Sequence, residues 1–421
     1  MPYRIAGVDV HKKMLAVVIA DVEVDGAYEF VRRRVGTSPS ELRGLAAWLV
    51  AQEVDEVVME STAQYWRPVW ETLERDWQPS RRPPGGRLHL APAQSNQGAR
   101  GRKRDFPDAE RLVKRLVADE LTLSFVPDPE QRLWRTVVRR KQQVTSNRVQ
   151  LQNRLESLLE EAHLKLSSLV SDLLGASARR ILQAVADGEA SPARLAALAS
   201  QRLRATPEQL SDALGACTTL HPVYRRLLGL TLEELRVLED HLDQLDQELA
   251  RLLRAHQAGV QRLAEVPGLG VDSAQQIIAE VGAAAATFPS AKHLSSWVGA
   301  CPGDEESAGV NASHRSPKGN RQMRRLLNQA ANAAVKTKGT IFELVYRRLV
   351  PRLGHAQAIG AVAHRLCRLI WEILHQGVRY EERGPAVLAR RTQRRAAKMI
   401  RELRSLGYSV ALAPASASPL G

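Results

Sequence analysis

An acidic residue ends the first apolar stretch of the chain, and this limits how the N-terminal part can fold. Residues 3–10 are mostly apolar up to Asp9, a polar break follows at residues 11–13, and a second apolar run covers residues 15–20. Such runs are typical of strands buried on both faces of a sheet, and the break fits a tight hairpin. A carboxylate at the end of a central strand is costly unless a partner or a metal ion neutralises it. Asp9 therefore either caps the turn or belongs to a site, and this stretch alone leaves both interpretations open.

The next hundred residues alternate between helical and extended patterns. We expect further strands at residues 28–35, 56–60 and 88–91, and helices over residues 39–52, through Trp70 and Leu73, and from about Phe106. Ser38 is the expected cap of the 39–52 helix. Three strands followed by alternating helices and strands outline a ribonuclease-H-like α/β fold over residues 1–125.

Four acids fall where that fold brings its metal ligands together, at the ends of strands one and four and on a later helix. They are Asp9, Glu60, Asp105 and Asp108. The i, i+3 spacing of the last two places both on one side of a helical turn. Crowded carboxylates repel one another unless a cation joins them, and hard oxygen ligands suit Mg²⁺ or Mn²⁺, which assist phosphoryl transfer. First-turn acids favoured by the helix dipole are the alternative for Asp105 and Asp108, but the four acids together favour a metal site.

Charge and composition indicate the kind of partner. The 421 residues suffice for two or three domains, and the net charge of +14, with a pI near 10.1, favours a polyanion. The scattered Cys217, Cys301 and Cys367 show neither a metal-binding spacing nor a disulfide framework, as in a reducing cytoplasm. We find no signal-peptide pattern and no apolar run long enough to span a bilayer, so we expect a cytoplasmic protein that binds nucleic acid rather than a membrane.

The middle of the chain, residues 126–255, is predicted to be helical. A polar helix is expected over residues 130–164, and its basic side chains either face nucleic acid or are simply solvated; they are Arg135, Arg139, Arg140, Lys141 and Arg148. Leucines repeat every seven residues within residues 226–253, with a second interleaved set, which predicts a coiled-coil helix. These are Leu228, Leu235, Leu242 and Leu249, and Leu238, Leu245 and Leu252. Its partner is either the 130–164 helix or another protomer, and the charged flanks favour self-association.

Residues 256–385 form a mainly helical C-terminal domain in this interpretation. Gly268 and Gly270 separate two helical patterns, as in a helix-hairpin-helix element whose second helix holds a phosphate on its free amides, although a plain helix connection is the alternative. A basic run from Arg315 to Arg352 predicts a phosphate-contacting surface. Its candidates are Arg315, Lys318, Arg321, Arg324 and Arg325. Residues 386–421 are expected to form a basic helix and a disordered tail.

Several blocks of this sequence resemble one known family. The block from Gly7 to Lys12, the block from Met59 to Trp66 and the block from Gly101 to Ala109 are similar to the DEDD insertion-sequence transposases, relatives of the pilin-gene invertases. The Val-Pro-Gly-Leu-Gly block at residues 266–270, the Ser-x-Gly turn at Ser307 and the Lys-Gly-Asn-Arg block at residues 318–321 extend the resemblance to residue 382. The sequence departs from the usual pattern at Ala63 and Arg104, neither of which is a metal-ligand position.

The resemblance implies a site, partners and an activity. It implies a RuvC-like N-terminal domain whose tetrad is Asp9, Glu60, Asp105 and Asp108, and it assigns a nucleophilic role on DNA phosphate to Ser307, with Ser313 and Ser316 as rivals. Many members assemble as oligomers and use an element-encoded RNA that pairs with target and donor DNA. We therefore expect a DNA transposase that excises and inserts its own mobile element by metal-assisted serine attack, guided by an RNA. The alternatives are a metal-dependent, hydrolytic junction nuclease and a non-enzymatic helix-hairpin-helix DNA-binding protein.

Overall fold

The structure is a computed structural model that describes residues 3–22, 28–79, 87–96, 105–200, 203–301, 305–307, 310–313 and 316–411. The chain divides into two compact units, residues 1–127 and residues 128–421, and each is described by itself. No helix of the described residues is both long enough and apolar enough to cross a membrane.

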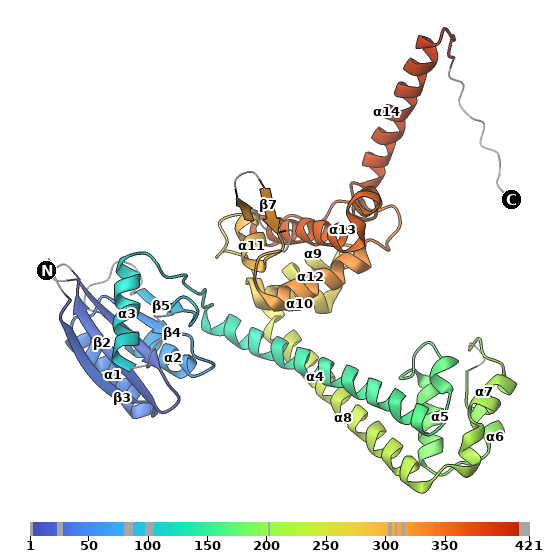
Figure 1. The fold of residues 1–421 in the computed structure, drawn as a ribbon, viewed down its shortest axis with the longest axis horizontal. Coiled ribbons are helices and arrows are strands. Elements are labelled where there is room, and N and C mark those ends of the chain that lie inside the picture. The colour runs from blue at the N-terminus through green and yellow to red at the C-terminus, as the bar shows by residue number, and fades with distance from the viewer. Residues whose placement is uncertain are drawn as a thin grey trace. The chain divides into compact units, whose positions relative to one another are not determined.

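The first unit is built on a five-stranded mixed sheet (Figure 1). Its strands are β1 (Arg4–Val10), β2 (Met14–Asp21), β3 (Phe30–Gly36), β4 (Glu56–Glu60) and β5 (Arg87–Ala91), in the order β3-β2-β1-β4-β5. The first three strands pair antiparallel, whereas β4 runs parallel to β1 and β5 parallel to β4. The mixed α/β sheet expected from the sequence is therefore present, with β1 at its centre.

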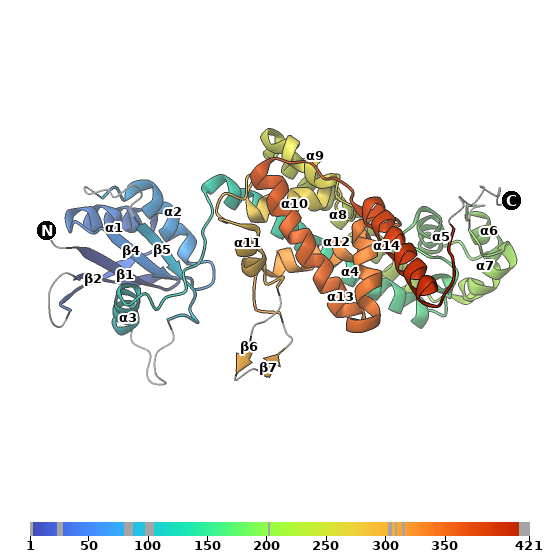
Figure 2. The same cartoon turned by 90° about the horizontal axis from the view of Figure 1, so that it is seen from above.

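Helices cover both faces of this sheet (Figure 2). The helices α1 (Pro39–Ala51) and α2 (Trp66–Asp76) pack on one face, and α3 (Asp105–Val117) packs on the other. Because side chains alternate along a strand, Ala6, Val8 and Val10 face α1 and α2, while Ile5 faces α3. Ser38 caps α1 as expected, in a capping box with Glu41. The same alternation puts Asp9 on the α3 face.

Gly7 lets α3 lie close to the central strand. A Cβ atom at this position would come within 2.3 Å of the carbonyl oxygen of Ala109 and 2.9 Å of the Val113 side chain. Any larger residue would push α3 away from β1. Gly7 lies two residues before Asp9 on the same face, so the close approach occurs beside the end of β1 where that carboxylate lies.

The second unit begins with two long helices that run side by side in opposite directions (Figure 1). They are α4 (Pro129–Glu161) and α8 (Pro222–Leu252), and their register is visible in two ion pairs, Lys141 with Asp246 and Arg148 with Glu239. Moving seven residues forward on α4 moves seven residues back on α8, as antiparallel packing requires. Leu235 of the heptad pattern is buried with residues of α4 in one core.

The self-association that the leucine pattern favours stays a prediction. The pattern packs within the chain, against the helix that the sequence analysis named as the other possible partner. Between α4 and α8 lie short helices, α5 (Ala176–Ala186), α6 (Pro192–Ala197) and α7 (Pro207–Ala213). Pro192 and Pro207 begin α6 and α7, because proline is accommodated in the first helical turn.

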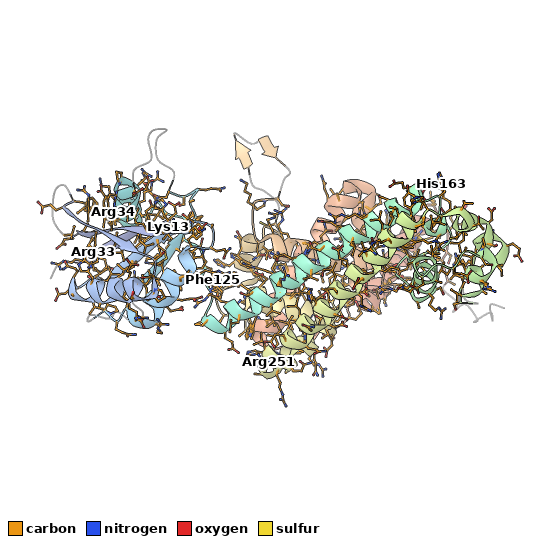
Figure 3. All side chains as sticks on the ribbon, turned by 90° about the horizontal axis from the view of Figure 1, so that it is seen from below. Lys13, Arg33, Arg34, Phe125, His163 and Arg251 are labelled. Carbon is orange, nitrogen blue, oxygen red and sulfur yellow. The ribbon has the colours of Figure 1, made fainter. Side chains whose placement is uncertain are left out.

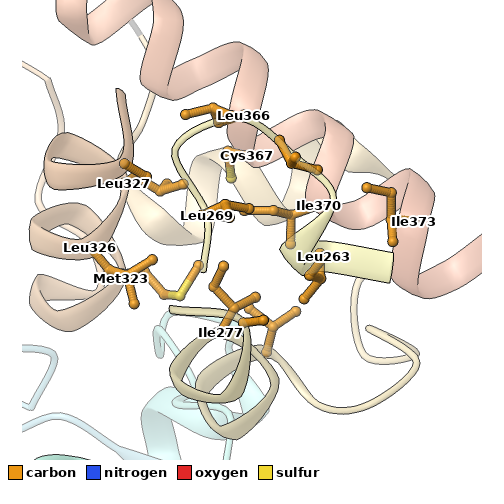
Figure 4. Close-up of a cluster of buried hydrophobic side chains, with 14 of the residues drawn as sticks. Leu263, Leu269, Ile277, Met323, Leu326, Leu327, Leu366, Cys367, Ile370 and Ile373 are labelled. Carbon is orange, nitrogen blue, oxygen red and sulfur yellow. The ribbon is translucent and has the colours of Figure 1, made fainter. Parts of the chain in front are cut away.

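A helical bundle completes the second unit. It contains α9 (Gln257–Ala264), α10 (Val271–Val281), α11 (Ala291–Val298), α12 (Arg321–Ala334), α13 (Ile341–Gln376) and α14 (Gly384–Ser405). Short 3₁₀ turns lie elsewhere in the second unit, at Leu166–Ser168, Gly215–Thr219 and Arg254–His256. Its core joins Leu263, Ile277, Leu327 and Ile370 from four of these helices (Figure 4). Between α11 and α12 the chain forms a short antiparallel hairpin, β6 (Glu305–Ser307) and β7 (Val310–Ser313).

Candidate functional site: a carboxylate cluster on the central strands

Asp9 and Glu60 share one face of the sheet because of strand register. Val8 of β1 pairs with Met59 of β4 in parallel, so the next residues of both strands are Asp9 and Glu60. Each lies one residue past a side chain that faces α1 and α2, which turns both acids toward α3. Asp9 is only 5% exposed, and Glu60 is half-buried at the end of its strand.

The first turn of α3 supplies the other two acids. Asp105 and Asp108 are both in this turn, and α3 packs on the face of the sheet that carries Asp9. Asp105 is the first residue of α3, one residue before the helix start expected from Phe106. The sheet and α3 therefore bring the four predicted acids to one side of the first unit.

The electrostatics of Asp9 show how crowded this side is. Burial is the largest influence on its carboxyl and raises its pKa, from an ordinary 3.8 to about 6. His11 acts in the opposite direction, while the negative charges of Glu60, Asp108 and Asp105 raise the pKa further. The Asp9 carboxylate therefore lacks enough positive charge nearby to offset its burial among like charges.

The ligand atoms nearest to one another come from two acids and a histidine. Among the described residues, Asp9, His11 and Asp105 place oxygen or nitrogen atoms within 4.8 Å of one another. His11 Nε2 lies 3.1 Å from Asp9 Oδ2 and 3.5 Å from Asp105 Oδ1. Glu60 and Asp108 lie outside this group, although their charges act on Asp9. The donor set fits a hard divalent cation, since it offers carboxylate oxygens around an under-neutralised buried acid.

Neighbouring side chains hold the other acids in place. Arg34 of the edge strand β3 (Figure 3) lies 3.5 Å from Asp105 Oδ2, and Arg111 lies 2.8 Å from Asp108 Oδ1. The buried amide of Asn96 donates to Glu60 Oε2 at 3.1 Å and to the backbone carbonyl of Asp108 at 3.3 Å. Asn96 thus connects β4 to α3 at the site.

The sequence did not lead us to assign four partners of these acids, His11, Arg34, Asn96 and Arg111. His11 could have been found, because it lies two residues after Asp9 in the short connection between two strands, and such a connection returns it to the strand end. Arg34, Asn96 and Arg111 carry no such signal. Their roles depend on strand order and on how α3 lies across the sheet.

Ser307, expected in a Ser-x-Gly turn, is the last residue of strand β6. Its backbone pairs with that of Val310 in β7, and its side chain lies outside the described residues. Arg315, predicted to contact phosphate, and His314 also lie outside them. The carboxylate cluster lies entirely within the first unit, and Ser307 lies in the second.

Two glycines, Gly299 and Gly319, allow the chain segments before and after this hairpin to cross closely, and we call this crossing the clamp. A Cβ atom on Gly319 would come within 2.3 Å of the carbonyl oxygen of Val298, and one on Gly299 would come within 2.6 Å of the carbonyl oxygen of Pro317. Gly299 also has φ of +71°, which favours glycine. Asn320 follows and caps α12 through its side chain. The Lys-Gly-Asn block therefore has a structural role, because it permits a close backbone crossing and starts a helix.

The other predicted phosphate-binding residues have mixed surroundings. Lys318, Arg321 and Arg324 are exposed near the start of α12, as a contact surface requires. Arg325 is half-buried, donates to Gln276 and Gln329, and has its pKa lowered by burial. It therefore helps to join α12 to α10.

Gly268 and Gly270 differ in what surrounds them. A Cβ atom on Gly268, whose φ is +86°, would come within 2.3 Å of the Ala330 carbonyl oxygen, so this glycine serves packing against α12. Gly270 precedes α10 and has open space where a side chain would stand. Asp272 occupies the first turn of α10 and pairs with Lys141. The phosphate-binding role of this hairpin stays a prediction.

Most of the basic residues expected to expose a charged face on α4 are paired within the chain. Arg135 and Arg139 bind Glu280, which is 1% exposed on α10, while Lys141 and Arg148 pair with acids of other helices. The interpretation as a nucleic-acid face is therefore not supported for these four residues. Their role is to fasten α4 to α8 and α10.

Comparisons with known proteins agree on one family. Residues 6–164 match a model of the DEDD type of IS110 transposase, and residues 260–347 match a model described as "Transposase IS116/IS110/IS902 family". A "Probable family 20 transposase" of Pseudomonas aeruginosa is 27% identical over 301 residues, which cover 69% of this chain and 78% of that protein. An "Insertion element IS110 uncharacterized 43.6 kDa protein" of Streptomyces coelicolor is 29% identical over 143 residues. That match spans only 34% of this chain and 35% of the relative.

Among solved structures, the chain is similar to that of Thermus thermophilus RuvC, with 13% identity and a TM-score of 0.23 over 29% of this chain and 99% of the other. The two family models fall one at each end of the sequence, the first over the carboxylate cluster and the second over α10 to α12. The chain is therefore similar to IS110 transposases over residues 6–164 and 260–347, and this similarity supports an enzyme that acts on DNA.

Proposed function

We propose that this protein excises and inserts its own mobile element by cutting and rejoining DNA. The observation that carries this proposal is the set of four acids that β1, β4 and α3 bring to one side of the first unit, with Asp9 buried and its pKa raised to about 6. Acids grouped at such a cost in a family of transposases point to phosphoryl transfer rather than to a structural role.

The tetrad Asp9, Glu60, Asp105 and Asp108 holds Mg²⁺ or Mn²⁺ in this proposal, with His11 beside it. Bound there, the metal would supply positive charge to a DNA phosphate and to the attacking or leaving oxygen. Asn96 keeps the Glu60 carboxylate turned toward α3. Arg34 and Arg111 orient Asp105 and Asp108 and limit their mutual repulsion.

Ser307 is the proposed nucleophile. Its Oγ forms a bond to a DNA phosphorus atom, the bond from phosphorus to one sugar oxygen breaks, and that oxygen leaves with a proton as a hydroxyl group. Rejoining reverses these changes with a hydroxyl of the new partner strand. The clamp formed by Gly299 and Gly319 supports this role, because it fixes both ends of the segment that carries Ser307.

A covalent-trapping assay tests the role of Ser307. Full-length protein is incubated with element-end DNA, the flanking RNA and Mg²⁺, denatured, and analysed for a DNA–protein adduct. The adduct is expected with wild type and with the control Ser316→Ala, and is expected to disappear in Ser307→Ala and Asp105→Ala. An adduct that persists in Ser307→Ala but is lost in Ser316→Ala would move the nucleophile to Ser316.

The second candidate, a hydrolytic metal-dependent nuclease, is favoured by one observation: the acid cluster is complete within the first unit. It predicts DNA cut without any adduct, and the same cutting in Ser307→Ala. A third outcome, in which Asp9→Asn leaves every activity intact, would indicate a DNA-binding protein whose acids are structural.

Guidance by an element-encoded RNA and assembly as a homo-oligomer complete the proposal. Acidic and basic residues nearly balance in residues 1–127, so almost all of the +14 net charge lies in the second unit, where a polyanion would bind. The RNA proposal fails if the purified protein binds its element's flanking RNA no better than a scrambled RNA of equal length. Sedimentation with and without the nucleic acids measures the oligomeric state.

A further inference from the structure

A cleft of about 1100 Å³ opens between α12 and the two halves of α13. Cys301 and Ser316, the described residues on either side of the 302–315 segment, both line it. Its volume is slightly above the range of roughly 300–1,000 Å³ that small-molecule sites occupy, so it suits an extended ligand.

A break in α13 makes the cleft. Pro351 removes a backbone donor, and Gly354 adopts φ 75° and ψ 172°, so the helix changes direction between them. Residues before the break, such as Arg348, and residues after it, such as Gly360, therefore line the same cleft. The Tyr346 hydroxyl and His355 Nδ1, 2.8 Å apart, join the two halves across the break.

Four arginines line this cleft and give it a strong positive charge. Arg324 comes from α12, and Arg348, Arg365 and Arg368 come from α13; all four are exposed. In the part of the chain that the structure describes, Arg348, Arg365 and Arg368 form no ion pair, and Glu372 is the one carboxylate among the lining residues. Unlike the paired arginines of α4, these three arginines therefore have positive charge available to bind an anion.

The floor of the cleft is apolar and belongs to the packed core. Leu327 lines the cleft and is only 1% exposed, and it packs among the buried residues of α12 and α13 (Figure 4). Leu349, Leu353 and Ile359 add aliphatic surface. An aliphatic floor below a guanidinium rim matches an unpaired nucleotide, whose base is apolar on its faces and whose phosphate is anionic. The stacked bases of a duplex cannot reach such a floor.

We propose that this cleft binds an unpaired stretch of DNA strand, with its phosphates against the four arginines and its bases against the aliphatic floor. The inference rests on the proposed function, which requires strands to separate from their old partners before they join new ones. Because Cys301 and Ser316 line the cleft, a strand held there lies next to the segment that carries Ser307. The site would hold the cut strand between cutting and rejoining.

Binding measured without cutting tests this proposal. Fluorescence anisotropy in EDTA compares full-length wild type with Arg365→Gln/Arg368→Gln on single-stranded DNA, duplex DNA and RNA of one sequence. The matched control, Arg347→Gln/Arg352→Gln, removes the same charge from the same helix outside the cleft lining. We expect the cleft variant to lose roughly tenfold in affinity for single-stranded DNA and the control less than about threefold, with equal small losses on duplex.

A variant that fills the cleft separates shape from charge. Gly360 has open space where a side chain would stand, so Gly360→Trp occupies the cleft while every arginine remains. It should weaken single-stranded DNA binding as the arginine variant does, whereas Gly360→Ala should not. Circular dichroism and melting curves confirm that each variant is folded.

The outcomes separate the two proposals. If the cleft and control variants lose equal affinity for single-stranded DNA, the proposal that the cleft binds DNA fails. If the cleft variant loses affinity for RNA alone, the cleft is assigned to RNA and not to DNA. If the cleft variants lose single-stranded DNA but wild type gives neither adduct nor cutting, the cleft stands and the proposed function fails. If adducts form as proposed while the cleft variants bind single-stranded DNA normally, the proposed function stands and the cleft proposal fails.

Discussion

At the scale of one residue, Asp9 shows the energetic cost of building a site that suits a cation. Its carboxylate is buried and faces three other acids, and its pKa is raised to about 6. A group whose pKa is higher in the folded state than in the unfolded state binds protons more tightly when folded. Its favourable contribution is complete below pH about 4 and is lost as the pH rises to about 6, so the metal-free protein is destabilised at neutral pH.

Replacing Asp9 with Asn should therefore stabilise the metal-free protein. At pH 7 in EDTA we expect Asp9→Asn to raise the free energy of unfolding of the first unit by about 1–3 kcal/mol, because the buried charge is removed. The gain should shrink as the pH falls from about 6 to about 4. Urea denaturation across this pH range measures it, and the exposed Glu29→Gln is the charge-matched control.

Added Mg²⁺ should reverse the order of stability. Wild type should gain stability with Mg²⁺ because the cation binds only the folded state, whereas Asp9→Asn should gain little. A metal-free Asp9→Asn protein that is less stable than wild type at pH 7 would show that the carboxylate is satisfied without a cation.

Gly7 gives a second test at this scale. Gly7→Ala should displace α3, because the new Cβ would meet the backbone of Ala109, which is itself packed on the sheet. We expect a loss of about 2–4 kcal/mol in stability and a weaker response to Mg²⁺, since Asp105 and Asp108 move with α3. Gly44→Ala in the exposed face of α1, where the new Cβ meets nothing, should be neutral or stabilising. Equal effects of the two changes would contradict the role given to Gly7.

Among single residues, the acids of the site could be predicted and their partners could not. Asp9 and Glu60 end apolar runs that read as strands, and Asp105 and Asp108 open a helix, so local sequence located all four. Asn96 lies in an irregular segment and is defined by its bonds to two other elements. Such partnerships depend on how distant parts of the chain pack, which residue spacing does not reveal.

At the scale of elements, the junction of α4, α10 and α12 is organised around one buried acid. Glu280 accepts hydrogen bonds from Arg139 of α4 and from the Asn320 side chain, which also caps α12. Arg135 completes its ion pairs. A buried carboxylate is stable only while these partners remain. The junction thereby fixes the start of α12, directly after the clamp that holds the 302–315 segment.

Two substitutions of Asn320 separate its roles. Asn320→Ala loses both the cap and the bond to Glu280, and should lower the stability of the second unit by about 2–3 kcal/mol. Asn320→Asp keeps the cap but places a carboxylate against Glu280, so it should destabilise by a similar amount at pH 7. Urea denaturation measures both, with the half-buried Asn332→Asp of the same helix as control. Wild-type stability in Asn320→Asp would mean that only the cap matters.

The elements themselves were easier to predict than their pairing. The leucine repeat of α8 indicated a helix with a packed stripe, and the helix is present, but the stripe is equally compatible with a partner in another chain. The α4 arginines looked available for nucleic acid because the acids that neutralise them are far away in the sequence: Glu280 follows Arg139 by 141 residues. Periodicity reveals that a face is buried without revealing what covers it.

At the scale of the whole molecule, charge is divided unequally between the parts of the chain. The first unit carries almost no net charge, and the second carries nearly all of the +14. A large share lies on α14, whose described residues are exposed apart from Gly384 and Ile400 and whose start packs where Gly384 lies against Gly339. Nucleic acid should therefore be captured mainly by the second unit, independently of the acid cluster.

Truncation after Gly384 tests the part of α14 in this capture. Because α14 buries little, the shortened protein should melt within a few degrees of wild type and keep the packing at Gly384. It should bind duplex DNA more weakly at low salt, and the slope of log affinity against log salt should become shallower by about 0.9 for each phosphate that α14 no longer neutralises. Asp9→Asn/Asp105→Asn is the control, and its slope should equal that of wild type because those acids bind no phosphate without metal. An unchanged slope in the truncated protein would place DNA capture on the other helices of the second unit and on the arginine cleft.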